Sequence, residues 1–354
     1  MFLGHTVTGT YSYPQHPMLF LTAAQLADQG VAIFFLISGF LLFRPFLAAR
    51  RSGRTLRLRD FYRRRALRIV PAYWVALTLF IVFGFVSGVT AHNWWIFYGF
   101  AQIYCLGTIG HGIGVAWTLC IEVTFYAALP AFAFAAAQLA RARESVRGDV
   151  ALLVVLSLAS LAFRTHFSAF SDYATVSALA GTFCWFALGM GLAIASVTDG
   201  DRPLSTPTRL VREHPALLWV IAVGSWSLLY EVSRSSQSVP TKLATHLLYG
   251  VVALFVLLPG VFGDTEGGVP RRVLRLRGLA WVGLVSYSFY LYHTIVIAQL
   301  AKSIRNGNPP HGYAFVLIVS AALSLACAAA SYYLVERPMM RLRRLPIATW
   351  WRLD

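Results

Sequence analysis

The chain has 354 residues, of which 58% are hydrophobic and only 12% are charged, and its formal net charge is +16. A soluble domain carries about a quarter of charged residues, so this composition excludes an ordinary soluble fold and indicates a polytopic membrane protein. The basic residues lie in clusters between apolar runs, as the positive-inside rule requires, and no nucleic-acid partner is expected.

The N-terminal part begins with a short apolar stretch. Residues 1–10 are too few for a span, which needs roughly 20 residues, so we expect the end of a helix whose beginning is missing. Residues 11–29 contain two prolines and are expected to form a loop. The apolar run 30–49 is long enough to span and leads into nine arginines between Arg50 and Arg68, which predicts a cytoplasmic end.

A return span is predicted over 69–88, and it is followed by a segment, 90–116, that contains two tryptophans and a glycine-rich run. A spanning helix within 90–116 would put the arginines that follow the next helix, 115–140, outside the membrane. We therefore predict an outer, interfacial or re-entrant segment there. The later spans are predicted at 149–163, 175–197, 215–234, 242–262, 279–301 and 313–335.

Together these elements predict an all-α, polytopic membrane helix bundle of about ten transmembrane helices, the first only partly present, in a single domain covering 1–354. Five of the 30 basic residues lie outside under this topology: Arg164, Arg234, Lys242, Lys302 and Arg305. We expect both ends of the complete protein to be cytoplasmic and the protein to reside in the cell (inner) membrane. The four cysteines form no close pair and are interpreted as packing residues, with neither a disulfide nor a metal implied.

Three ionisable side chains lie within predicted spans: His5, Glu122 and His293. At 1.5 Å per residue, each is roughly 8–12 Å below the outer boundary, so the three are predicted to meet. A carboxylate beside an imidazole orients a general base, which favours catalysis by these residues. The alternatives are a hydrogen bond to a neighbouring helix for His293 and simple pairing within the bundle for Glu122.

A second set of candidates follows the first full span. Arg64 and Arg68 are four residues apart and Arg65 and Arg68 three apart, so with Arg63 they form a helical face of guanidinium groups. Such a face suits a phosphorylated ligand, because arginine binds phosphate in a bidentate manner. The alternative is topology alone, with an attraction to anionic lipid of about 1 kcal/mol per arginine.

Small and aromatic residues supply further candidates. Gly39 permits the close approach of a helix or a ligand and the hydroxyl of Ser38 can donate to a carbonyl, although small-residue packing explains both equally well. The remaining aromatic candidates either line a cavity or anchor the protein at the membrane interface. They are Trp117, Tyr126, Tyr287 and Tyr290.

Five stretches in this order resemble the membrane acyltransferase-3 family, which O-acylates sugars, peptidoglycan, lipopolysaccharide and some antibiotics. They are FLISGFLL at 35–42, FYRRRALRIVPAYW at 61–74, WTLCIEVTFY at 117–126, SYSFYLYH at 286–293 and Glu336-Arg337-Pro338. In that family a basic residue precedes the functional histidine by about eleven positions, whereas Met1 is four before His5. We therefore expect the native chain to be N-terminally longer.

The resemblance implies transfer of an acyl group, acetyl in the simplest case, from cytoplasmic acyl-CoA to a hydroxyl of a carbohydrate or related acceptor at the outer side of the membrane. Acyl-CoA is then a co-substrate, and neither a tightly bound cofactor nor a metal is expected. His5 is the expected base and Glu122 holds either that base or the acceptor. The arginine face would bind the CoA phosphates, and Ser38 would lie beside the pantetheine arm.

Two rival functions fit the same pattern of spans. A transporter or flippase of a polar or lipid-linked solute also has polar residues and glycine-broken helices near the midplane. A scaffold that binds membrane lipids would use the arginine face. Thermal stabilisation by acyl-CoA distinguishes the enzyme from both rivals, because a ligand stabilises only the protein that binds it.

Overall fold

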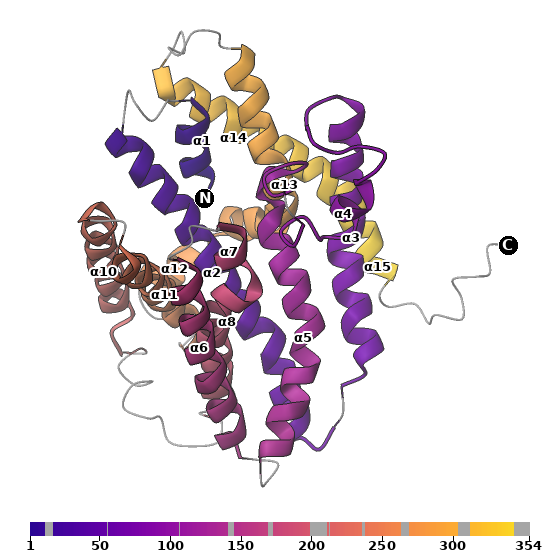
Figure 1. Cartoon of the computed structure of the whole chain (residues 1–354). Coiled ribbons are helices and arrows are strands. Elements are labelled where there is room, and N and C mark those ends of the chain that lie inside the picture. The colour runs from indigo at the N-terminus through magenta and orange to yellow at the C-terminus, as the bar shows by residue number, and fades with distance from the viewer. Residues whose placement is uncertain are drawn as a thin grey trace, which may run out of the picture. The chain divides into compact units, whose positions relative to one another are not determined.

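The computed structural model describes residues 1–10, 17–54, 56–105, 107–140, 145–168, 173–198, 211, 213–235, 238–262, 269–303 and 312–342. The regular elements in these ranges are all helices (Figure 1). The longer ones are α2 (Pro17–Arg51), α3 (Leu58–Val82), α5 (Trp117–Leu139), α6 (Arg147–Ser168), α8 (Leu179–Thr198), α10 (Pro215–Ser235), α11 (Val239–Val261), α13 (Arg277–Ser303) and α14 (Gly312–Ser331). The shorter ones are α1 (Phe2–Thr10), α4 (Trp94–Tyr98), η1 (Gly114–Ala116), α7 (Tyr173–Ser177), α12 (Val269–Leu274), η3 (Tyr332–Glu336) and α15 (Arg337–Leu342).

Nine helices of the described chain are long and apolar enough to cross a membrane. Each corresponds to one of the nine complete spans predicted from the sequence, so the prediction of a multi-pass, all-α membrane protein is confirmed. The region 90–116 contains only the five-residue α4 and the three-residue η1 among its described residues, which agrees with its assignment as a non-spanning segment.

Two predicted boundaries were wrong. The loop expected over 11–29 is helical from Pro17 onward, because the polar side chains near its end are hydrogen-bonded inside the bundle. Gln25 donates to the Ser233 hydroxyl, and Gln29 Nε2 donates to the carbonyl oxygen of Tyr249 at 3.2 Å. Residues 11–16 lie outside the described part of the chain.

The return span also differs from its prediction over 69–88, because α3 begins at Leu58 and ends at Val82. Much of the arginine field is therefore helical, and Gly84, with φ of 67°, lies just beyond the helix end in a conformation that favours glycine.

The described chain divides into two compact units. The first unit comprises Met1, Leu21–Leu56 and Cys120–Ala280, and the second comprises Phe2–Phe20, Arg57–Leu119 and Trp281–Asp354. Whether these units act as the single domain predicted from the sequence stays a prediction.

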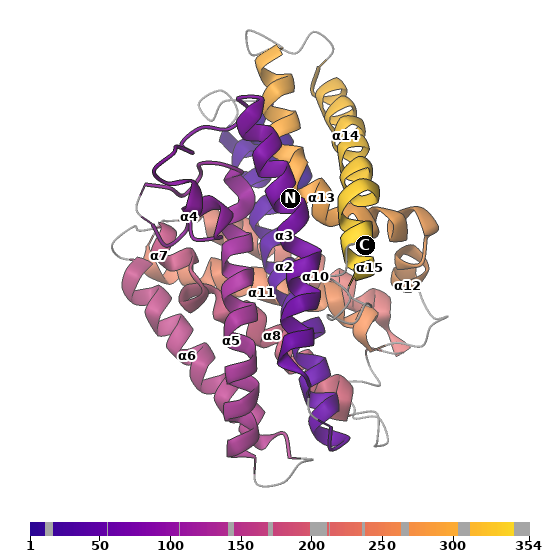
Figure 2. The same ribbon diagram turned by 90° about the vertical axis from the view of Figure 1, so that its right-hand side faces the viewer.

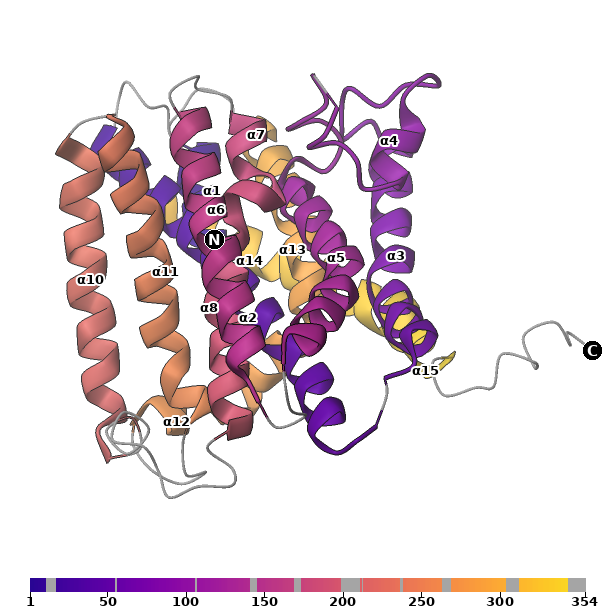
Figure 3. The same cartoon turned by 60° about the horizontal axis from the view of Figure 1, so that its bottom comes forward.

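In the first unit, α10 packs along α11 and α6 along α8 (Figure 3). Its aromatic core joins three helices, because the ring of Phe186 on α8 stacks on Phe35 of α2 at 4.5 Å and on Phe125 of α5 at 4.2 Å. The helices α2 and α8 approach closely at two glycines. Gly39 of α2 lies against the backbone of α8, and Gly189 of α8 lies against the backbone of α2.

In the second unit, α14 continues through the π-helical turn η3 into α15, and both η3 and α15 pack against α3 (Figure 2). The short helix α1 packs against α14. The buried carboxylate of Glu336, at the end of η3, accepts a hydrogen bond from Ser288 of α13, whose hydroxyl also lies 2.7 Å from that of Ser331.

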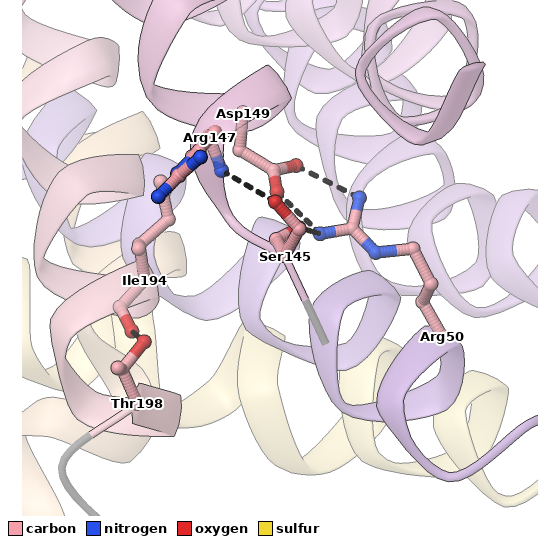
Figure 4. A network of polar contacts seen from close by, with 6 residues as sticks. All are labelled: Arg50, Ser145, Arg147, Asp149, Ile194 and Thr198. Atoms are coloured by element: carbon pink, nitrogen blue, oxygen red, sulfur yellow. Dashed lines mark hydrogen bonds and ion pairs between the residues drawn. The ribbon is translucent and has the colours of Figure 1, made fainter. Parts of the chain in front are cut away.

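The C-terminal end of α2 meets the N-terminal end of α6 through a bidentate ion pair (Figure 4). Arg50 Nη1 lies 3.0 Å from Oδ1 of Asp149, and Arg50 Nη2 donates to the second carboxylate oxygen and to the carbonyl oxygen of Ser145. Arg51 likewise donates to the carbonyl oxygen of Val197 at the end of α8. These ends are the ones that the predicted topology places together in the cytoplasm.

Replacing Arg50 by alanine is expected to destabilise the protein by about 3–5 kcal/mol, because the fully buried Asp149 carboxylate would lose its counter-ion. Thermal unfolding in detergent measures this loss. The double variant Arg50→Met with Asp149→Leu is expected to recover most of the stability, since an apolar pair leaves no buried charge. A double variant as unstable as Arg50→Ala would contradict this account of the pair.

Candidate functional site

Two of the predicted catalytic residues lie together in the second unit. The imidazole ring of His5 on α1 is 5.2 Å from that of His293 on α13, measured between ring centroids. Phe2 and Phe289 both contact the ring of His293, and the Phe289 ring stacks on it with an interplanar angle of 3°. Their meeting, predicted from helix depth alone, is therefore confirmed.

The hydrogen bonds of His293 determine which of its nitrogen atoms carries the proton. Nδ1 lies 2.8 Å from the carbonyl oxygen of Tyr290 and 3.1 Å from that of Phe289, and because carbonyl oxygens only accept, Nδ1 must donate. The lone pair of the neutral ring is then on Nε2, which is buried and has no hydrogen-bonding partner among the described residues. His293 thus presents a basic nitrogen in an apolar environment beside His5.

The α13 helix is held in place next to this histidine pair. The hydroxyl of Tyr290 lies 2.7 Å from that of Thr118 at the start of α5 and also donates to the carbonyl oxygen of Val115. One turn earlier, the Tyr287 hydroxyl donates to the carbonyl oxygen of Ile69 on α3 at 2.9 Å. These contacts give Tyr287 and Tyr290 a role in positioning α13, and a further role in lining a cavity stays a prediction.

The third predicted catalytic residue, Glu122, belongs to the first unit. Its carboxylate Oε1 accepts a hydrogen bond of 2.7 Å from the hydroxyl of Ser38 on α2, and both residues are buried. The meeting of Glu122 with the two histidines stays a prediction, because they belong to different units. The pairing with Ser38 was not predicted, since helix depth says nothing about which side of a helix a residue faces.

For Gly39, the structure favours a role in helix packing over a role in contacting a ligand. A Cβ atom there would lie 2.2 Å from the carbonyl oxygen of Phe186, so the backbone of α8 fills the space next to this glycine. Of the remaining aromatic candidates, Tyr126 is buried and Trp117 is half-buried, both on α5.

The four predicted phosphate-binding arginines lie on α3 in the second unit, as a helical face requires. Arg64 and Arg68 are exposed, whereas Arg63 and Arg65 are half-buried. Arg63 donates to the carbonyl oxygen of Leu342 at the end of α15. The exposed pair is therefore the part of the face that is best placed to contact a ligand.

Sequence reasoning missed several polar residues within the membrane spans. Asp28 was assigned to a loop because the predicted span began at residue 30. The sequence assigned Cys184 to packing, but its Sγ lies 3.0 Å from Nε2 of the buried His246. Glu336 was noted only as part of a motif, although a carboxylate so close to the end of a span is itself a signal of a buried polar contact.

Comparison with known proteins adds a family match. A family model described as an acyltransferase domain matches residues 1–329. The chain is 27% identical to nodulation protein 10 of Rhizobium leguminosarum bv. viciae, covering 98% of this chain and 89% of that protein. It is 28% identical to the exopolysaccharide production protein ExoZ of Rhizobium meliloti, covering 88% of this chain and 89% of the relative.

A more distant similarity extends to enzymes of the bacterial cell wall. The chain is 23% identical to the peptidoglycan O-acetyltransferase OatA of Listeria monocytogenes, with 88% of this chain aligned to 51% of that protein. The chain thus spans about half the length of this relative. No solved structure matches the chain.

Proposed function

Because the chain belongs to the acyltransferase-3 family of membrane O-acyltransferases, we propose that it transfers an acyl group from acyl-CoA to a hydroxyl group of a carbohydrate. The relatives named for O-acetylation and for exopolysaccharide production support an acetyl group and a carbohydrate acceptor. The predicted topology supports a donor on the cytoplasmic side and an acceptor on the outer side of the cell membrane, with both ends of the complete protein in the cytoplasm.

The observation that supports this chemistry most is the pair of His5 and His293. In the proposed step, His5 takes the proton of the acceptor hydroxyl while the oxygen attacks the thioester carbonyl carbon. The C–S bond breaks, and the CoA thiolate leaves with the proton that His5 returns. The basic Nε2 of His293, which accepts but does not donate, would bind a proton of His5 or of the hydroxyl.

Glu122 and Ser38, which belong to the first unit, also have proposed roles in acyl transfer. Glu122 would orient the acceptor or the base through its carboxylate, as expected from the sequence, and Ser38 sets the direction of that carboxylate through their hydrogen bond. The pantetheine arm of the donor would pass near Ser38.

The donor is proposed to bind through its phosphates at Arg64 and Arg68. Replacing either residue by glutamine is expected to raise the KM for acetyl-CoA by about tenfold, because a charge-assisted hydrogen bond to phosphate contributes roughly 1.5–3 kcal/mol. The measurement is steady-state release of free CoA by the purified protein. The value of kcat should change little, since the arginines do not contact the reacting atoms.

Arg59 provides a matched control because it is exposed on the same helix but faces away from Arg64 and Arg68. The variant Arg59→Gln is expected to keep the normal KM. A donor that lacks the 3′-phosphate should bind more weakly to the unmodified protein. Its KM should also rise less when Arg64 or Arg68 is replaced. Equal effects of all three arginines would instead indicate a general attraction between this helix and anions.

A further inference from the structure

The second unit carries a non-spanning segment with an unusual surface, here called the aromatic cap, which consists of residues 83–105 and 107–113. Four of its aromatic side chains are at least half exposed: Phe83 at 63%, Trp94 at 54%, Trp95 at 55% and Tyr104 at 50%. Exposed aromatic residues that lie together mark a binding surface or a membrane anchor.

Hydrogen bonds from side chains to backbone carbonyl oxygens fix the fold of the cap. The indole N–H of Trp74 donates to the carbonyl oxygen of Tyr98, and the Tyr73 hydroxyl donates to that of Phe97, both at 3.0 Å. Asn93 Nδ2 donates to the carbonyl oxygen of Gly88 at 2.8 Å. Gly88 has φ of 79° and lies against the His111 ring, so no larger residue fits this turn. The backbone on both sides of Trp94 and Trp95 is therefore fixed by these contacts.

A groove of about 470 Å³ runs beside the exposed indole of Trp94. This volume is typical of sites for small ligands. The groove combines an aromatic wall with residues that carry hydroxyl groups, Thr90 and Tyr98, and the Tyr98 hydroxyl lies 2.6 Å from that of Thr78 outside the groove. Its lining residues are Ile81, Val89, Thr90, Ala91, Trp94 and Tyr98.

The charge of the cap restricts the class of ligand. The sequence from residue 83 to residue 116 contains no Asp, Glu, Lys or Arg. Interfacial segments that bind anionic lipid combine their aromatic residues with Lys or Arg, and sites for charged ligands require charges of the opposite sign. An uncharged surface of aromatic rings and hydroxyl groups fits a neutral saccharide, whose C–H face packs on a ring while its hydroxyls form hydrogen bonds.

The cap is also attached, within the second unit, to the helix that bears His293. Phe80, near the end of α3, makes an edge-on ring contact with Tyr292 at 5.2 Å. Just beyond the cap, the carbonyl oxygen of Val115 accepts from the Tyr290 hydroxyl. Tyr290 and Tyr292 both precede His293 closely in sequence, so the residues on either side of the cap pack near this histidine.

We propose that the groove beside Trp94 binds the neutral carbohydrate acceptor through stacking on the Trp94 indole, with Trp95 extending the aromatic surface. This inference rests on the proposed function, which it deepens by assigning an acceptor site to the aromatic cap.

The test is equilibrium binding of neutral oligosaccharides to the whole protein in lipid nanodiscs. The probes are the tetramers of glucose in β-linkage, of glucose in α-linkage and of N-acetylglucosamine, measured by tryptophan fluorescence or calorimetry without acyl-CoA. At least one probe is expected to bind, and Trp94→Ala is expected to weaken that binding about tenfold. The exposed aromatic residue Phe134, in the C-terminal part of the span α5, supplies the control: Phe134→Ala should bind normally.

Two conservative variants separate stacking from membrane anchoring. Trp94→Tyr keeps an aromatic face and is expected to bind within about threefold of the unmodified protein, whereas Trp94→Leu keeps apolar area but no ring and should bind as weakly as Trp94→Ala. The proposal is overturned if no probe binds, or if the leucine variant binds as well as the tyrosine variant.

The binding assay is independent of the proposed acyl transfer. Oligosaccharide binding without His5-dependent cleavage of acyl-CoA would support the cap and contradict the proposed function. Conversely, His5-dependent acyl transfer with normal acceptor affinity in Trp94→Ala would support the function and reject the cap as the acceptor site.

Discussion

Replacing His5 by alanine is expected to lower acyl transfer by about 10²–10⁴-fold, because the acceptor hydroxyl would lose its general base. The protein should remain folded, since His5 is only half-buried on the short helix α1 and its removal leaves no unpaired charge. The measurement combines the rate of transfer with the thermal unfolding temperature of the same preparation. Binding of acetyl-CoA should be retained, because the proposed phosphate contacts lie on α3.

The histidine pair predicts a second result in the same assay. His293→Ala is also expected to reduce the rate, and the double variant of His5 and His293 should lose little more than the worse single variant, because residues that act as a unit are not additive. His214→Ala is the control, since this histidine is exposed. Fully additive losses, or an equal loss in the control, would contradict a joint role of the pair.

Replacing Gly189 by alanine is expected to prevent correct folding or to reduce stability by at least about 1–3 kcal/mol. A Cβ atom at Gly189 would lie 1.9 Å from the carbonyl oxygen of Leu36, and backbone atoms of α2 cannot move aside as a flexible side chain does. The measurement is the yield of monodisperse protein together with its thermal unfolding temperature.

The same helix offers a matched control for this prediction. Gly191 lies two residues further along α8, and a Cβ atom there would have no neighbour within 4 Å. Gly191→Ala is therefore expected to be neutral or to stabilise the protein by roughly 0.5–1 kcal/mol, the usual gain of alanine over glycine in a helix. If both variants behaved alike, the close crossing of α2 and α8 would be wrong.

The spans were predictable because lipid imposes a strong constraint on composition. About 20 apolar residues are needed to cross a bilayer, and this length stands out in the sequence. The end of α2 is one example, since Arg50 and Arg51 bind the ends of α6 and α8 that the charge distribution assigns to the same side. The start of the same helix was missed, because Gln25, Asp28 and Gln29 are polar.

The candidate site was only partly predictable. Counting residues along a helix gives the depth of a side chain, which is why His5 and His293 were expected to meet. Depth does not give the direction in which the side chain points, and Glu122 bonds to Ser38, a contact between residues that are 84 positions apart in the chain. The carboxylate of Asp149 escaped notice for a related reason, since its burial depends on the packing of α2 against α6.

The most direct test of the proposed function is the release of free CoA from acetyl-CoA by the purified protein, compared with that by His5→Ala, alongside thermal stabilisation of each by the ligand. We predict that acetyl-CoA stabilises both proteins, by about 2.7 kcal/mol at 100 times Kd, and that only the unmodified protein cleaves it at a substantial rate. If neither protein binds or cleaves acyl-CoA of any chain length from acetyl to palmitoyl, the acyltransferase account is contradicted and solute transport becomes the leading explanation.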